Sequence, residues 1–433
     1  MTDLKQTPSN HPKREQSLEH LSGKDLTKAL FRGEVPTDII AMLPAQSLYM
    51  AIQSMGLESG REVLPYVTEE QYTCLLDFHL WNRDELSEEH FWQWLETVDV
   101  EESLEPLGKF LASIDLKLIC ILITKYLEVR INTEPTDTPL EEGFYTPDRG
   151  YTWIKINLEN GSYHRLFGKL LAYVFEESPE RFYQLLASAQ GATTVELEEM
   201  SYKEKVHRLL DEGIPDHESA WKVHAKLQIQ SILSNQAQKK NNIVTYESVV
   251  TPLVLDDKEL QPLSGLFQEM LTSGNRDDRD NAQKELTLIA NAALVFFQIP
   301  FHEYEEVSLL VQKIRGAINI GLEMLLRTNT HSALEWFQKE GFQTMYRLGL
   351  NQIKDTSKEI LSMKDWIESS SSYSSLAAPL LECMALAFPS IPAFLTEGGI
   401  KPSTDGTLDP TAKPILRLSQ LETLLASLKK ELS

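Results

Sequence analysis

Apolar residues recur at three- and four-residue spacing through most of the chain, from about residue 24 onward. This spacing collects them on one side of a helix, so the sequence predicts a mainly α-helical protein. Apolar and polar residues alternate instead over residues 151–158, which is the period of a β-strand. We therefore expect at most one or two short strands, near residues 151–158.

The helices predicted between residues 36 and 81 are short and closely spaced. Leu43–Leu48 is echoed by Val67–Tyr72, because a helix-start signal precedes an apolar face in both. In the second copy, Thr68 and Gln71 have the spacing of a capping box. Short helices repeated in this way are typical of a stack with a superhelical course.

Changes in composition divide the chain into four parts. The first is polar and poor in residues to bury, and proline and glycine clusters mark the later boundaries. We predict a disordered tail (1–22), an N-terminal stacked-helix domain (23–140), a middle helical unit with a short strand (141–235), and a C-terminal helical domain (236–433) with a linker (401–414) and a terminal helix.

Three helices have specific expectations. Leu116–Arg130 is apolar on nearly all sides, which predicts the buried central helix of the first domain. In the terminal helix, leucines from Leu418 to Leu428 line one face, and Ser419 with Glu422 fits a capping box. We expect this face to dock on its own domain, with a partner protein as the alternative. Leu286–Ile299 and Leu376–Leu395 are apolar but interrupted by polar residues or prolines, which favours buried core helices over membrane spans.

The formal net charge is −23, from 41 basic and 64 acidic residues. A surface with this much negative charge repels phosphate backbones and anionic lipids. We therefore expect neither nucleic acid nor a membrane as partner. Solubility is the favoured explanation of the acidity, and cation storage is the alternative. The cysteines, Cys74, Cys120 and Cys383, lie far apart in apolar helical segments, which predicts buried free thiols in a reducing cytoplasm.

Patterns that hold phosphates, dinucleotides or a nucleophilic serine are absent from the sequence. Two groups have metal-binding side chains, and in both we favour another interpretation: scattered structural histidines and a solvated loop. The groups are His207, His217 and His224, and Asp277, Asp278 and Asp280. We therefore expect no cofactor and no metal.

Two polar segments, Tyr145–Tyr151 and Lys203–Gly213, combine charged side chains with conformationally special glycine or proline. If a functional surface exists, polar groups on loops held by helices are a natural place for it. An alternative, which we favour for Arg208 and Asp211, is a surface ion pair on one helix face. The candidate residues are Tyr145, Asp148, Tyr151, His207, Arg208 and Asp211.

The chain resembles an uncharacterised family of bacterial proteins over most of its length. The resemblance rests on Leu43–Trp81, on Tyr145-Thr146-Pro147-Asp148 with Tyr151, on His207–Gly213, and on Gly321-Leu322-Glu323 with Ala333–Leu348. Leu43–Trp81 also resembles the stacked-helix intracellular domain of MgtE-type magnesium transporters and of the flagellar rotor switch protein. These likenesses imply a stacked-helix fold and, through the transporters, a response to magnesium, but no catalytic residues.

Together these features favour a cytoplasmic helical protein that binds other proteins or regulates them. One alternative is a module that responds to a divalent cation such as magnesium, suggested by the acidity and the transporter likeness. Another is an enzyme of unrecognised type, which requires the segments around Tyr145 and His207 to meet at a pocket. The sequence leaves the oligomeric state open.

Overall fold

A computed structural model describes residues 23–100, 103–138, 141–234, 260–273, 275–328, 330–370, 374–396, 399–400 and 408–432. The fold is mainly helical with a few short two-stranded antiparallel sheets, which confirms the predicted class. The chain forms two compact units, residues 1–209 and 210–433. The three-domain division stays a prediction, and the tail 1–22 and the first half of the linker 401–414 lie outside the described residues.

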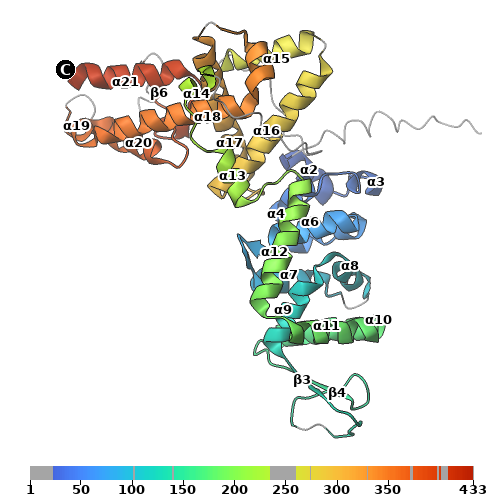
Figure 1. Ribbon diagram of the computed structural model, residues 1–433. Helices are drawn as coiled ribbons and strands as arrows, with labels where there is room; N and C mark the ends of the chain where they lie inside the picture. Colours follow the sequence, from blue (N-terminus) through green and yellow to red (C-terminus); the bar gives the residue numbers. More distant parts are fainter. Residues whose placement is uncertain are drawn as a thin grey trace, which may run out of the picture. The chain divides into compact units, whose positions relative to one another are not determined.

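Unit 1 is a succession of short helices interrupted by two small β-ladders (Figure 1). Its elements are α2 (Gly23–Phe31), α3 (Thr37–Ile40), α4 (Ala45–Met55), α5 (Leu57–Gly60), η1 (Leu64–Tyr66), α6 (Glu69–His79), β1 (Trp81–Asn82), β2 (Glu85–Leu86), α7 (Glu88–Val98), α8 (Glu105–Ser113), α9 (Leu116–Tyr126), β3 (Leu127–Ile131), β4 (Thr152–Ile156), α10 (Gly161–Glu177), α11 (Pro179–Gly191) and α12 (Thr194–Asp211).

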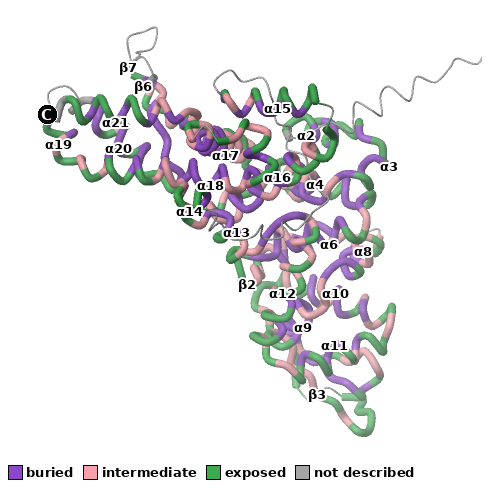
Figure 2. Tube along the Cα trace, turned by 45° about the horizontal axis from the view of Figure 1, so that its top comes forward, coloured by how far each residue is buried: buried purple, intermediate pink, exposed green. Residues whose placement is uncertain are grey.

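Local sequence signals define the ends of several helices in unit 1. Thr68 and Gln71 form the predicted capping box of α6, and the Ser178 side chain caps α11, which has proline at its first position. The helices turn their buried sides toward one another (Figure 2), with aromatic residues such as Phe91 and Trp94 fully enclosed. Cys74 and Cys120 are buried free thiols in α6 and α9, as predicted.

The predicted helix Leu116–Arg130 is too long. The helix α9 ends at Tyr126, and the next residues form β3, which pairs antiparallel with β4 from Leu127↔Ile156 to Ile131↔Thr152. Alternation of Leu127, Val129 and Ile131 with charged residues fits a strand with unlike faces, and β-branched residues favour it. The predicted strand near 151–158 is confirmed by β4, and the β3–β4 ladder joins residues on both sides of position 140.

Unit 2 is built around long helices. Its elements are α13 (His217–Val223), α14 (Ile229–Leu233), α15 (Leu263–Thr272), α16 (Arg276–Phe297), α17 (Tyr304–Leu326), α18 (Ala333–Ser362), α19 (Lys364–Ser369), α20 (Ser374–Ala385), β5 (Ile391–Pro392), β6 (Leu395–Thr396), β7 (Gly399–Ile400), β8 (Ala412–Lys413) and α21 (Leu418–Leu432). The strands pair as β5 with β8 and β6 with β7.

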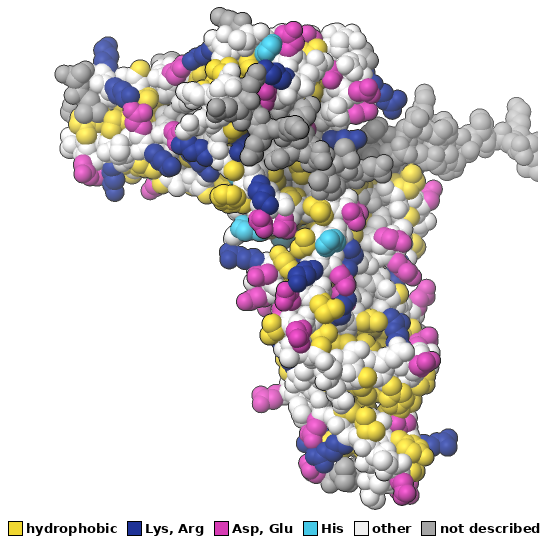
Figure 3. Space-filling view, viewed as in Figure 1, with side chains coloured by type: hydrophobic (Ala, Val, Ile, Leu, Met, Phe, Trp, Pro, Cys, Tyr) yellow, Lys and Arg dark blue, Asp and Glu magenta, His cyan; other side chains and the backbone are white. Residues whose placement is uncertain are grey.

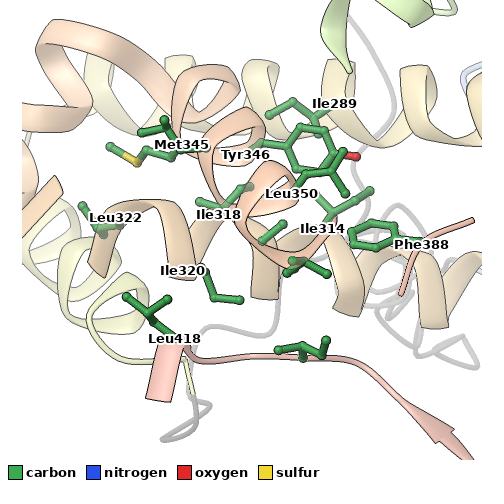
Figure 4. Packing of buried hydrophobic residues seen from close by; sticks show 14 of the residues in the cluster. Ile289, Ile314, Ile318, Ile320, Leu322, Met345, Tyr346, Leu350, Phe388 and Leu418 are labelled. Atoms are coloured by element: carbon green, nitrogen blue, oxygen red, sulfur yellow. The ribbon is translucent and has the colours of Figure 1, made fainter. Parts of the chain in front are cut away.

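Packing of α17 against α18 forms the centre of unit 2 (Figure 4). The two backbones approach closely where glycines meet them: a Cβ on Gly321 would lie 1.9 Å from the Met345 carbonyl oxygen, and one on Gly349 would lie 1.8 Å from that of Ala317. The terminal helix α21 completes this core with buried Leu418, Leu421 and Leu428. Its apolar face therefore docks on its own unit, as predicted.

The predicted capping box of α21 is wrong. The carboxylate of Glu422 pairs with Arg327 at 2.5 and 2.9 Å instead of turning back to the helix start. The side chain of Gln420 accepts the backbone N–H groups of Leu416 and Arg417 in its place. The Glu422 carboxylate, which the local spacing assigned to the helix cap, therefore forms a long-range ion pair instead.

Helix α18 is interrupted at Gly341, whose φ of +73° lies in the left-handed region that favours glycine. The helix resumes beyond it, and the buried carboxylate of Glu285 on α16 accepts the backbone N–H of Phe342 at 2.5 Å. A carboxylate at this point satisfies donors of a new helical turn and complements its dipole. Glu285 therefore acts as a long-range cap.

Two further predictions in unit 2 need correction. Asp277, Asp278 and Asp280 lie in helix α16 rather than in a solvated loop, and Asn275 caps that helix. Acids in a first helical turn are stabilised by the helix dipole. The predicted core helix Leu376–Leu395 ends at Ala385 as α20, because prolines follow and short strands replace it. The predicted core helix Leu286–Ile299 is confirmed by α16, which ends at Phe297.

Among the described residues, no helix combines the length and the apolar character that crossing a bilayer requires. Cys383 is a buried free thiol on α20, like the other two cysteines.

Candidate functional site

The six candidate residues from the sequence do not form one site. Tyr145, Asp148 and Tyr151 belong to the loop beside β4, whereas His207, Arg208 and Asp211 lie in the last turns of α12. Within unit 1, β3 and β4 lie at the end opposite to those last turns (Figure 1). His207 and Asp211 are exposed. The catalytic arrangement that requires both segments at one pocket is therefore not present.

Asp148 holds its loop together. One carboxylate oxygen accepts the Thr152 backbone N–H at 2.7 Å and the Thr146 hydroxyl at 3.0 Å. The other accepts the Tyr183 hydroxyl of α11 at 2.6 Å. Burial alone would raise the pKa of Asp148, but these hydrogen bonds together lower it. The Thr146 hydroxyl also accepts the N–H of Gly150, so these polar groups are used internally.

The aromatic residues of the same loop remain open to solvent. Tyr145 is 40% exposed and Tyr151 48% exposed, and Ile131 at the end of β3 is 66% exposed. Tyr145 forms an antiparallel bridge with Ile154 of β4. The Tyr151 carbonyl accepts the N–H of Asn132, the residue that follows β3. We call Ile131, Tyr145 and Tyr151 the hairpin-end residues.

Arg208 joins α12 to α6. Its guanidinium binds the carboxylate of Asp77 through two hydrogen bonds of 2.7 and 2.9 Å. The Asp77 side chain is 7% exposed and that of Arg208 31%. Burial raises the pKa of Asp77, while the arginine opposes that rise. The predicted pair of Arg208 with Asp211 is therefore wrong, because a buried acid 131 residues away takes the guanidinium.

Lys205 lies one turn before Arg208 and is only partly exposed. Its Nζ is 5.0 Å from the ring centroids of both Trp81 and Tyr202 and donates to the Arg83 carbonyl at 3.1 Å. These contacts are cation–π interactions and one hydrogen bond. Burial lowers the pKa of Lys205 to about 8, although nearby Asp77 opposes the change.

Further polar contacts continue along α12. The Ser201 hydroxyl donates to Asp115 at 2.7 Å, and Lys117 binds Glu204 at 2.7 Å. The Leu86 N–H donates to Glu198, while Leu197, Ser201 and Leu209 are the buried residues of this helix. We call this contact surface of α12 the α12 joint. Charges of both signs are interspersed on the face of unit 1 seen in Figure 3.

The three histidines considered as metal ligands have different environments. His224 is buried, stacks on Phe296 at 4.2 Å, and its Nδ1 lies 2.7 Å from the Ala220 carbonyl oxygen. Burial lowers its pKa to about 4. His207 and His217 are exposed, and the described part of the chain contains no cluster of three metal-binding side chains.

A pocket of about 490 Å³ opens among helices α4 to α7 of unit 1. We call it the α4–α7 pocket. His79 is buried in its wall, with the ring stacked on His90 at 4.2 Å and edge-on to Trp94. The lining residues are Gln53, Leu57, Glu58, Arg61, His79, Gln93, Glu96 and Thr97.

Five polar side chains of this pocket form neither a side-chain hydrogen bond nor an ion pair with a described residue. They are those of Gln53, Glu58, Arg61, Gln93 and Glu96. The Nε2 atom of Gln53 is also buried. Burying such a donor without an acceptor costs about 1–3 kcal/mol. These groups are therefore free to bind a ligand, unlike those of the α12 joint.

A second pocket, of about 630 Å³, lies in unit 2 beside the start of α21. Its charged groups are largely engaged with each other: Arg327 binds Glu422, and Glu323 accepts the Leu418 N–H and approaches Arg417. We therefore regard the α4–α7 pocket as the better candidate site. The sequence carries no signal for this pocket, because residues 53–97 contain no motif that joins its members.

Comparison with known proteins identifies the family alone. Residues 5–396 match the model of a family of unknown function, DUF6178, and the chain belongs to that family. Neither a search of curated proteins nor a search of solved structures gave a match. The likeness of Leu43–Trp81 to the magnesium transporters and the rotor switch protein stays a prediction.

Proposed function

We propose that this protein is a non-catalytic interaction or regulatory module that binds another protein in the cytoplasm through the β3–β4 end of unit 1. The observation that carries the proposal is the exposure of the hairpin-end residues, Ile131, Tyr145 and Tyr151. Tyrosine is enriched at protein interfaces because it buries a large rigid surface and retains a polar tip. Such residues at the end of a β-ladder suit a binding surface.

The geometry of β3 adds an open strand edge beside Ile131, on the side of β4 opposite to Tyr145. The hydrogen bonds from Asn132 to Tyr151 and from Asn157 to Tyr126 flank the ladder. In an antiparallel register this directs the N–H and C=O groups of Leu127, Val129 and Ile131 away from β4. Among the described residues, β3 pairs with β4 alone. An extended segment of a partner can therefore add to this edge.

The enzyme alternative gains less support. Asp148, Arg208 and Asp77 are the strongest polar groups near the predicted residues, and all are bound to protein groups. A group that already forms short internal hydrogen bonds must break them before it can act on a substrate. We therefore assign these residues structural roles.

The test is quantitative cross-linking of the tagged protein in its native host, followed by mass spectrometry. The variant combines Ile131→Pro with Tyr151→Ser. Proline removes only an outward N–H at position 131, so the ladder keeps its hydrogen bonds. We expect a saturable partner that the wild-type protein binds and this variant loses.

Val195→Ser is the matched control, because Val195 is 71% exposed on unit 1 but lies in α12. It must retain the partner. Circular dichroism checks that both variants fold. A wild-type protein without a specific partner, or a partner that the hairpin variant still binds, would contradict the proposal. Analytical ultracentrifugation shows whether the partner is a second copy.

A further inference from the structure

The α4–α7 pocket points to a second binding activity that is independent of the β3–β4 surface. We propose that it binds a small zwitterion, a molecule with one ammonium and one carboxylate group, such as a free α-amino acid. The proposal rests on the convergence of unpartnered groups of both signs on one pocket of about 490 Å³. This volume lies within the usual range for small-molecule sites.

The charged groups define the ligand class. Arg61 offers a guanidinium, which matches a carboxylate through paired hydrogen bonds. Glu58 and Glu96 offer carboxylates, which accept from an ammonium group. None of the three forms an ion pair with a described residue. A ligand with both charges can satisfy both kinds of group at once.

Other ligand classes fit less well. A nucleotide or another polyphosphate would place several negative charges beside Glu58 and Glu96, and like charges at short range repel. A dicarboxylate would likewise place negative charge beside these two carboxylates. A simple amine would leave Arg61 without a counter-charge. A zwitterion avoids each of these costs.

The uncharged groups provide orientation. Gln53 has a buried amide donor without a partner, and a change of its side-chain rotamer would turn this donor toward a ligand oxygen in the pocket. Gln93 on α7 adds a second amide. The His79 ring is fixed by stacking on His90 and by the edge of Trp94. Rigid walls reduce the entropy that binding costs. The pocket residues come from four helices, α4 to α7, and from Arg61 just after α5, so the helical stack itself holds the site.

The first measurement uses the full chain with pools of the common free α-amino acids at millimolar concentration, followed by thermal unfolding. A ligand that binds only the native state raises the melting temperature. Isothermal titration calorimetry then gives the affinity of any active amino acid. We expect its deaminated and decarboxylated analogues to bind at least about tenfold more weakly, since each loses one charge pair.

Two variants localise the binding. Arg61→Gln and Glu96→Gln change exposed side chains that have no protein partner, so both should fold normally. Each should weaken the amino acid by about tenfold or more. Arg32→Gln is the control, because Arg32 is a 65% exposed arginine of unit 1 outside the pocket. It should leave the affinity unchanged.

Three outcomes would overturn the proposal. One is the absence of any stabilising amino acid in the pools. A second is binding that Arg61→Gln and Glu96→Gln leave unchanged. The third concerns the magnesium alternative: if Mg²⁺ alone stabilises the protein, and Glu58→Gln with Glu96→Gln abolishes the effect while Arg61→Gln does not, the pocket is a cation site. None of these outcomes depends on the β3–β4 surface.

Discussion

At the α12 joint, charged side chains from distant parts of unit 1 meet in pairs, as Arg208 does with Asp77 and Lys117 with Glu204. At the α4–α7 pocket of the same unit, Glu58, Arg61 and Glu96 converge without partners among the described residues. Both regions are polar and both are built by short helices. They differ in whether the polar side chains form hydrogen bonds and ion pairs with other groups of the protein.

This difference separates a structural role from a binding role. A buried pair is costly to break, because the remaining charge is left without compensation. A solvated side chain without a partner contributes little to stability and is available to a ligand. Predictions about stability therefore concern the α12 joint, and predictions about binding concern the pocket.

The largest expected effect comes from breaking the buried pair. Arg208→Met should lower the free energy of unfolding of unit 1 by about 3 kcal/mol, since Asp77 is left buried without its partner. Urea denaturation of the full chain, followed by tryptophan fluorescence, measures this loss. Lys203→Met on the same helix is the control, because the exposed pair of Lys203 and Glu199 should contribute about 0.5 kcal/mol or less. Equal losses in the two variants would contradict the structural role.

A smaller effect should appear as a pH dependence from Lys205. Its pKa is about 8 in the folded protein against 10.5 as the ordinary value. Between these values the unfolded chain binds more protons, so stability rises with pH from about 8 to 10.5 and the penalty is fully present below pH 8. Because Lys205 is partly exposed, we expect a rise of roughly 1–2 kcal/mol.

Lys205→Met isolates this contribution, because other lysines and tyrosines titrate in the same range. The difference in unfolding free energy between wild type and variant should change with pH between 8 and 10.5 and stay constant from pH 6 to 7.5. A difference that is flat over the whole range would show that the amine is not desolvated.

The smallest expected effect is at the pocket. Glu58→Gln and Glu96→Gln should each change the free energy of unfolding by less than about 0.5 kcal/mol, since neither carboxylate has a protein partner to lose. The same urea titration measures this, and Arg208→Met provides the large reference value. A loss of several kcal/mol in either glutamine variant would mean that the pocket acids stabilise the fold, and the contrast with the α12 joint would disappear.

The sequence predicts what depends on near neighbours. The helical class, the capping box of Thr68 with Gln71, the strand at 152–156 and the buried face of α21 all follow from local spacing, and the structure confirms them. The strand β3 was missed because its residues continue an apolar helix, and only pairing with β4 decides its conformation.

Long-range partners explain the remaining errors. The spacing of Arg208 and Asp211 suggested a local pair, but Asp77 competes for the guanidinium from 131 residues away. The spacing of Ser419 and Glu422 likewise suggested a capping box, but the Glu422 carboxylate pairs with Arg327. The α4–α7 pocket is harder still to predict, because its eight lining residues carry no shared motif and meet only when four helices have stacked. Such a site is visible in the sequence only as ordinary polar positions on amphipathic helices.

The docking of α21 has a consequence for synthesis of the chain. The core of unit 2 requires Leu418, Leu421 and Leu428, which join α17 about a hundred residues later in the sequence. Translation proceeds from the N-terminus at about 5–20 residues per second. Unit 1 can therefore close while unit 2 is still being made, whereas the apolar face of unit 2 that α21 covers stays open for several seconds. During that interval this apolar face is exposed to solvent, and exposed apolar surface on a nascent chain is a target for chaperones.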